Sequence, residues 1–339
     1  MAIISRFSET RTRWIVRGVG AVLVAYALIV LGLMWWWSYE PELFDVNAAA
    51  RDHAAVHQQQ PVVGTAVTST LMQCAQTLLD KRGGYLSNDK FPPGVLMDNV
   101  PNWEFGVLTA TRDLAREMRN KFSRSQSQSE EDVDLKEADP LFSSPNDRWL
   151  LPSSEGQYRK AIAHVDGYLA RLGKNDTNGA QFYARADSLA DYLDTVSSRL
   201  GSLSQRLSAS VGQLQLEGDA PVDPSATNAP KGTVQQTVKT PWNQIDDVFY
   251  ESRGYTWALL EQLKAVQADF APILQRKNAV VSLKQVIREL EESQKPVHSP
   301  MILNGSPFGF FANHSLVMAN YVSRANAAVI DLKSLLDRG

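Results

Sequence analysis

Residues 182–207, FYARADSLADYLDTVSSRLGSLSQRL, carry the strongest periodic pattern in the chain. Apolar residues recur there at alternating spacings of four and three, the a/d pattern of a helix that packs along one seam. Few opposite-charge pairs flank the seam to select a separate partner chain. We therefore expect this helix to pack against helices of its own chain. The seam residues are Phe182, Ala186, Leu189, Leu193, Val196, Leu200, Leu203 and Leu207.

The sequence on both sides of this seam also follows helical periods, and no sustained alternation indicates a strand. Glycine and proline interrupt the helices in two irregular loops, an aromatic-rich one at 83–103 and a second at 296–305 that leads into the aromatic residues of 306–311. The pattern predicts an all-α bundle of about six or seven helices. The expected helices cover residues 62–81, 103–125, 154–172, 178–207, 241–270, 272–295 and 306–335.

A second decisive stretch lies near the N-terminus, where residues 18–37 contain no charged residue. At about 1.5 Å per residue these twenty residues span ~30 Å, the hydrocarbon thickness of a bilayer. Aromatic residues at both ends fit the headgroup regions, and the arginines that flank the segment lie on its N-terminal side. We expect a single transmembrane helix with a cytoplasmic N-terminus. The flanking charges are Arg6, Arg11, Arg13 and Arg17 before it and Glu40 and Glu42 after it.

The alternative for this stretch is a cleaved secretory signal. Its apolar region exceeds the usual ~7–15 residues of a signal peptide, and bulky aromatic residues occupy the place of a small-residue cleavage site. An uncleaved anchor is therefore favoured. The predicted organisation is a basic cytoplasmic tip (1–17), a transmembrane helix (18–37), a juxtamembrane stalk (38–61), a first helical half (62–212), a linker rich in Pro, Gly and Thr (213–240) and a second helical half (241–339).

Charge and cysteine content exclude some classes of protein. The net charge of the 339 residues is −3, and because residues 1–17 carry +3, the remainder carries −6. A mildly acidic body lacks the basic surface that nucleic-acid binding requires. Cys74 is the only cysteine, so no intramolecular disulfide forms, and we expect it to be a buried apolar residue.

Two histidines, His53 and His57, share one face of a short helical segment at a spacing that metal sites use. No glutamate follows His53 to complete an H-E-x-x-H motif, and Asp52 is the only carboxylate nearby. The pair is weak evidence for a metal, and a solvated polar stalk is the favoured interpretation. We expect no cofactor.

Three carboxylates, Asp89, Asp98 and Glu104, lie in or next to the first aromatic loop. A pair of carboxylates near aromatic residues is what a glycan-cleaving site needs. Carboxylates in such turns more commonly accept hydrogen bonds from the local backbone, and one in a first helical turn complements the helix dipole. No nucleophile elbow, phosphate-binding loop or dinucleotide motif accompanies them. The sequence therefore leaves enzymatic activity open but favours its absence.

Large aromatic residues in the two loops are the candidates for partner binding. They either fold inward to cap the bundle, which is the default, or form an exposed contact patch. We expect the two loops to meet at one end of the bundle. The candidate contact residues are Tyr85, Phe91, Trp103, Phe308 and Phe310.

Several motifs resemble a family of proteobacterial inner-membrane proteins that carries the designation domain of unknown function (family 2333). They are Gly83–Asp89, Pro92–Gly94 and Asn102–Gly106, with further similarity at 123–129 and 304–313. The resemblance extends over nearly the whole chain. It implies a Gram-negative inner-membrane protein with a periplasmic domain, and it brings no activity or catalytic residue with it.

The function that we favour is a non-enzymatic envelope protein whose periplasmic bundle binds an envelope protein partner. Residues 18–37 would contact the lipid bilayer. The alternatives are a peptidoglycan- or glycan-acting enzyme that uses the carboxylates of the 83–105 loop, and a bundle that binds a lipid or another hydrophobe. The sequence leaves the oligomeric state open.

Overall fold

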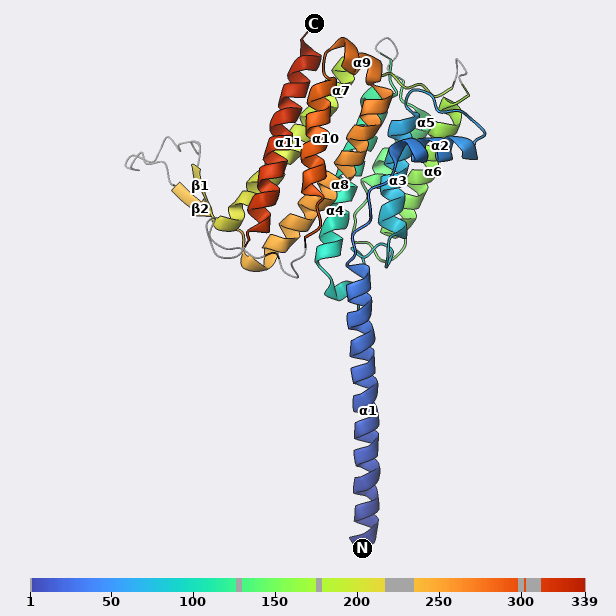
Figure 1. The fold of residues 1–339 in the computed structure, drawn as a ribbon. Coiled ribbons are helices and arrows are strands. Elements are labelled where there is room, and N and C mark those ends of the chain that lie inside the picture. The colour runs from blue at the N-terminus through green and yellow to red at the C-terminus, as the bar shows by residue number, and fades with distance from the viewer. Residues whose placement is uncertain are drawn as a thin grey trace, which may run out of the picture.

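The N-terminal helix stands apart from the rest of the fold (Figure 1). The structure, a computed structural model, describes residues 2–125, 130–174, 179–216, 235–297, 302 and 312–338. Helix α1 runs from Ala2 to Trp37, and its part from Arg13 to Trp37 is predominantly apolar and almost entirely uncovered by the rest of the protein. This part is long and apolar enough to cross a membrane, as predicted for residues 18–37.

The remaining described residues form a helical bundle, so the predicted all-α class is confirmed. Some predicted boundaries hold: a helix ends just before Gly83-Gly84, and another runs from Ser154 to Leu172. The helices are α2 (Val46–Val56), α3 (Thr65–Asp80), α4 (Asn99–Glu117), α5 (Val133–Phe142), α6 (Ser154–Leu172), α7 (Ala186–Ser208), α8 (Ile245–Asp269), α9 (Ala271–Arg276), α10 (Val280–Ser293) and α11 (His314–Asp337), with short helical turns at Gly94–Leu96, Met118–Phe122, Ala209–Val211 and Trp242–Gln244.

Helices α4 and α8 pair at the centre of the bundle. Helices α7, α10 and α11 lie on one side of this pair, and α2, α3, α5 and α6 lie on the other (Figure 1). One hydrophobic core includes residues from both sides of the 213–240 segment. That segment therefore separates two stretches of sequence whose helices share a single core.

The seam of α7 is buried by the chain's own helices, as expected. Its side chains from Leu189 to Leu207 are buried, and α7 packs most extensively against α11. The helix begins later than predicted, at Ala186. Phe182 precedes the helix, and its ring packs 5.4 Å from that of Phe122 and 5.7 Å from that of Phe270.

The backbones of α4 and α8 approach closely where two glycines face the opposite helix. A Cβ atom on Gly106 would lie 2.0 Å from the carbonyl oxygen of Glu251, and one on Gly254 would lie 2.0 Å from that of Trp103. Real side chains do not tolerate such distances. The central helix pair therefore requires glycine at both positions.

Residues 38–61, expected to form a juxtamembrane stalk, are instead folded against the bundle. Helix α2 buries Val46, Ala49, Ala50 and Ala54. Gln59 donates a hydrogen bond of 2.8 Å to the carbonyl oxygen of Ala170 near the end of α6. Figure 1 shows α2 well away from the point where α1 leaves the bundle. The four buried residues of α2 recur at helical spacing, but the helix is too short and alanine-rich to stand out in the sequence.

Several carboxylates of the acidic stretch 130–139 are paired with arginines within the fold. Asp132 caps α5 by accepting hydrogen bonds from the next turn, and Arg171 contacts it at 2.8 Å. Arg119 lies 3.1 Å from Asp139 and 3.2 Å from Glu131. Two arginines therefore fix this stretch to the helical turn that follows α4 and to α6.

The predicted linker begins and ends as a short β-hairpin stem. Strand β1 (Gln213–Leu216) pairs antiparallel with β2 (Gln235–Val238), with Gln213 opposite Val238. Each strand has four residues, which is too short for its alternation to be read from sequence. This pair is the only sheet in the described part of the chain.

Candidate functional site

Glu104, one of the three candidate catalytic carboxylates, is fully buried. Its two oxygens accept hydrogen bonds of 2.8 Å from the backbone N–H groups of Leu86 and Ser87, and the Lys81 ammonium lies 2.5 Å away. Lys81 also donates to the carbonyl oxygen of Gly84. Burial raises the pKa of Glu104, and Lys81 with the donated hydrogen bonds opposes that rise. The carboxylate thereby fastens the start of the loop to α4.

The other two carboxylates have different neighbours. Asp98 precedes α4 and accepts a hydrogen bond of 2.9 Å from the N–H group of Asn99. Burial raises the pKa of Asp89, and the negative charge of Glu155 on α6 raises it further. Asp98 instead faces the start of α8, where its negative charge helps to raise the pKa of Asp246. The charge of Lys81 therefore acts on both Asp89 and Glu104, whereas Asp98 faces the start of α8.

The aromatic candidates divide into buried and exposed residues. Tyr85 is buried and donates a hydrogen bond of 2.9 Å to the carbonyl oxygen of Asn146. Trp103 is buried with its ring 5.4 Å from that of Trp257. Both close the core from within, so neither presents a surface to a partner.

Phe91 is the exposed member of the described aromatic candidates, with 67% of its surface accessible. Phe308 and Phe310 lie outside the described residues. The described ends of the two loops both lie near the segment that follows α1: Val100 and Trp103 line one small cavity with Tyr39, and Val297 lines a groove with it.

The two candidate metal ligands are not brought into a metal centre in the part of the chain that the structure describes. His57 Nε2 lies 2.8 Å from Asp166 Oδ1 on α6. His53 lies on α2 and is partly exposed. No cluster of three or more potential ligands forms among the described residues. The ring of His57 instead joins α2 to α6.

Arg253 on α8 fixes the segment after α1 to the bundle. Its Nε atom lies 2.7 Å from both carboxylate oxygens of Glu40. Its two Nη atoms donate to the carbonyl oxygens of Ser293, Gln294 and Lys295, at 2.9–3.1 Å. These carbonyls lie at the end of α10, where a helix leaves acceptors without partners. One buried guanidinium thus binds both the segment after α1 and the end of α10.

Two further contacts hold α1 in place. The ring of Trp37 occupies the space beside Gly83, where a Cβ atom would lie 2.6 Å from it. The guanidinium of Arg82 lies 5.0 Å from the centre of the Tyr39 ring, a cation–π distance. With the Glu40–Arg253 pair, these contacts attach α1 to the bundle on two sides.

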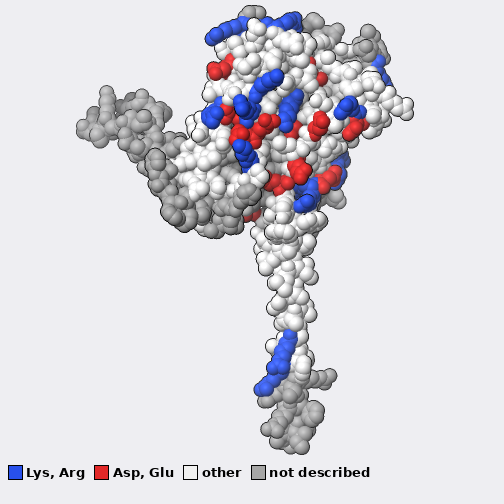
Figure 2. Space-filling view, in the orientation of Figure 1, with Lys and Arg blue, Asp and Glu red and all other residues white. Residues whose placement is uncertain are grey.

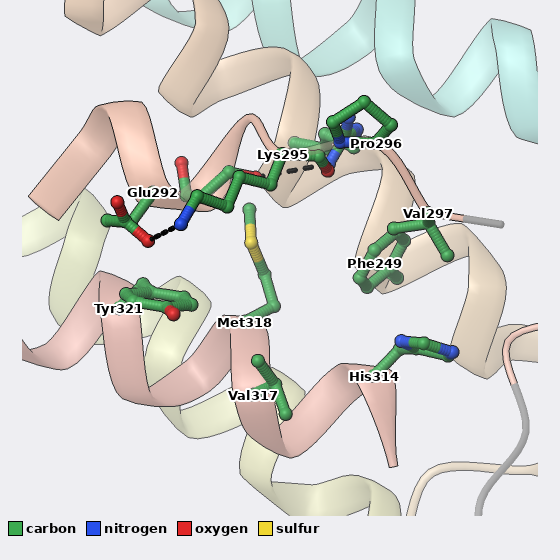
Figure 3. Close-up of a pocket in the computed structure, with 11 residues that line it drawn as sticks. Phe249, Glu292, Lys295, Pro296, Val297, His314, Val317, Met318 and Tyr321 are labelled. Carbon is green, nitrogen blue, oxygen red and sulfur yellow. Dashed lines mark hydrogen bonds and ion pairs between the residues drawn. The ribbon is translucent and has the colours of Figure 1, made fainter. Parts of the chain in front are cut away.

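A groove lies beside this attachment, between the start of α8, the end of α10 and the start of α11 (Figure 3). It has a volume of about 550 Å³. Figure 3 shows Phe249, Val297 and Met318 around one space, with the Lys295–Glu292 ion pair at its edge. The full lining is Phe249, Arg253, Glu292, Ser293, Lys295, Pro296, Val297, His314, Val317, Met318 and Tyr321.

The groove continues to α1. A second depression of about 810 Å³ shares part of its lining with the first and extends to Trp35 in the last turns of α1. We call the two together the junction groove. The residues that line both parts are Phe249, Arg253, Pro296 and Val297.

Little in the amino-acid sequence indicates this site. Arg253 and Glu40 are 213 positions apart, and a single arginine in an apolar helix follows no motif. Its only sequence signal is its position between Ser252 and Gly254 on a face that is otherwise apolar. Met318 and Phe249 look like ordinary core residues by their helical spacing.

The fold and the groove define an all-α bundle that carries one N-terminal helix long and apolar enough to span a membrane. The chain belongs to the family of uncharacterised proteins conserved in bacteria designated DUF2333, whose model matches residues 8–339. The resemblance found in the loop motifs is thus confirmed. Neither the curated proteins nor the solved structures include a match to the chain.

Proposed function

We propose that this protein is a single-pass inner-membrane protein with a cytoplasmic N-terminus and a periplasmic bundle. The bundle acts as a non-enzymatic scaffold that receives an apolar, membrane-adjacent segment of a second envelope protein in its junction groove. The charge distribution supports the orientation, because arginines precede the apolar helix and glutamates follow it. Figure 2 shows basic residues on the described part of the rod far from the bundle, while its white surface between them and the bundle carries no charge on this face.

The observation that carries the proposal is the continuity between α1 and the groove. Trp35 of α1 and Val297 of the bundle line the same depression. In a bilayer the tryptophans at the end of α1 lie at headgroup level, so the groove opens at the membrane surface. A segment that leaves the membrane beside α1 would enter it directly.

The lining suits an apolar protein segment. Phe249, Val317 and Met318 supply apolar surface, while Lys295 and His314 lie at the same site. An aromatic and methionine-containing groove with polar groups nearby is typical of sites that bind one face of an amphipathic helix. As formed by the described residues, the groove is open on one side rather than enclosed, which favours a segment of a protein over a sequestered small molecule.

Reporter fusions test the proposed orientation. A reporter active only in the periplasm should be active when fused after Gly339 and inactive when fused before Met1. Replacing the four N-terminal arginines with glutamine should reduce this asymmetry, because the positive-inside bias sets the orientation. A C-terminal fusion that is active only with a cytoplasmic reporter would contradict the proposal.

Crosslinking in intact membranes tests the groove. A photoreactive amino acid at Val317 should crosslink to a second membrane protein, with the attachment mapped by mass spectrometry to a segment next to its membrane span. Ile330 provides a matched control, because both residues are on α11 and both are 52% exposed, but Ile330 does not line the groove. Equal crosslinking at both positions would contradict the proposal that the junction groove binds the partner. Adducts of phospholipid mass alone at Val317 would favour the lipid-binding alternative.

A further inference from the structure

Two loops, one between α3 and α4 and the other between α5 and α6, expose large apolar side chains that do not pack into the core. Between them, Trp149 is the least exposed at 49% and Leu151 the most at 96%. The first of these loops also buries Tyr85 and Leu86, whereas residues 143–153 of the second are exposed or half-buried. We call the exposed set the loop patch. It consists of Phe91, Val95, Leu96, Trp149, Leu150 and Leu151.

The two loops are held together by specific contacts. The rings of Phe91 and Trp149 lie 5.9 Å apart in an edge-to-face arrangement. Asn88 donates a hydrogen bond of 2.8 Å to the carbonyl oxygen of Arg148 and one of 2.7 Å to Glu155 at the start of α6. The exposed side chains are therefore carried on one fixed surface.

The loop patch lies at the end of the bundle from which α1 leaves. Gly83, at the start of the first loop, contacts the Trp37 ring, and Lys81 and Asn99, on either side of that loop, line a cavity with Tyr39. Figure 1 shows the adjoining ends of α3 and α4 next to the exit of α1. Trp37 marks headgroup depth in the proposed membrane arrangement, so this end of the bundle lies at the membrane surface.

We infer that the loop patch is a second membrane contact, which inserts into the boundary between headgroups and acyl chains of the leaflet that α1 enters. The inference rests on the proposed membrane anchoring. Its occupant is the phospholipid bilayer, because one of the two loops that carry the patch begins beside Trp37, where α1 reaches the bundle. Tryptophan and phenylalanine partition favourably to this boundary, and apolar side chains exposed to this degree in water are unfavourable. The bundle would then contact the bilayer both through α1 and through the patch.

Depth measurements on the full chain in vesicles of neutral phospholipid test this inference. Cys74 is fully buried, so a cysteine at an exposed position can be labelled selectively with an environment-sensitive fluorophore. The matched variants are Leu151→Cys in the patch and Val281→Cys, which is 77% exposed at the start of α10. Nitroxide-bearing lipids should quench the label at 151 several-fold more than the label at 281. A water-soluble quencher should show the opposite preference.

A third labelled variant distinguishes a failure of the loop contact from a failure of the proposed membrane anchoring. Val24→Cys places a label within the apolar helix, where 59% of the native side chain is exposed. Lipid quenching at 24 but not at 151 would overturn the loop contact and leave the anchoring intact, whereas quenching at neither position would overturn both. Protection of the 151 label in native membranes but not in pure lipid would also overturn the inference, since the patch would then bind a protein. Circular dichroism of each labelled variant should match that of the wild type.

Discussion

Replacing Lys81 with methionine is expected to lower the free energy of unfolding by about 3–5 kcal/mol, the usual cost of breaking a buried ion pair. The side chain of Lys81 is 3% exposed and that of Glu104 is 0% exposed. The substitution leaves a buried carboxylate without its counter-ion. Denaturant unfolding of the full chain in detergent micelles, followed by circular dichroism, measures the change. Lys90→Met at an exposed position of the same loop should change stability by less than about 0.5 kcal/mol.

The loss should depend on pH in a defined direction. Burial raises the folded-state pKa of Glu104 above its unfolded value, so its favourable contribution is present below the unfolded value and is lost as pH rises through the folded pKa. Removing Lys81 raises that pKa further, because the lysine opposes the rise. The Lys81→Met variant should therefore lose less stability at acid pH than at pH 8. An equal loss at both values would mean that the ion pair is not the cause.

Gly254→Ala should destabilise the bundle by about 3 kcal/mol, at the upper end of the usual cost of overpacking. The added methyl group would meet the backbone of Trp103 in α4, which cannot move aside as a flexible side chain can. Helices α4 and α8 would have to separate at the centre of the core. Thermal and denaturant unfolding measure the effect.

Gly201→Ala is the matched control for this substitution. Gly201 also lies within a helix, α7, but the nearest atom to a new Cβ would be Asn326 Nδ2 at 3.6 Å, an ordinary contact. Alanine should there raise stability by up to about 1 kcal/mol through its helix propensity. If both alanine variants changed stability alike, the close approach of α4 and α8 would not be the reason.

The features that the sequence predicted depend on local pattern. The α7 seam from Leu189 to Leu207, the uncharged N-terminal helix and the helix end before Gly83 each follow from spacing or from a single residue's backbone preference. A periodic apolar face must be buried whatever it packs against, which is why the all-α class was predictable.

The features that the sequence did not predict depend on distant partners. Glu104 reads as an ordinary first-turn acid until Lys81 and the backbone of Leu86 are placed beside it. Arg253 acquires its role only when Glu40 and the end of α10 meet it. Pairing between such residues leaves no period in the sequence, so the junction groove had to be found in the structure.

Because Glu40 and Trp37 attach α1 to the bundle, we expect the helix and the bundle to move as one rigid body. In the proposed membrane arrangement the uncharged residues 18–37 extend roughly 30 Å, close to the ~30 Å hydrocarbon layer, and the tilt of the helix follows the thickness of that layer. Because Arg253 and Gly83 hold it on two sides, a change in tilt turns the whole bundle through the same angle. A thinner membrane would lean the bundle further over, and a thicker one would raise it. Membrane thickness would thus set how far the groove stands from the lipid surface.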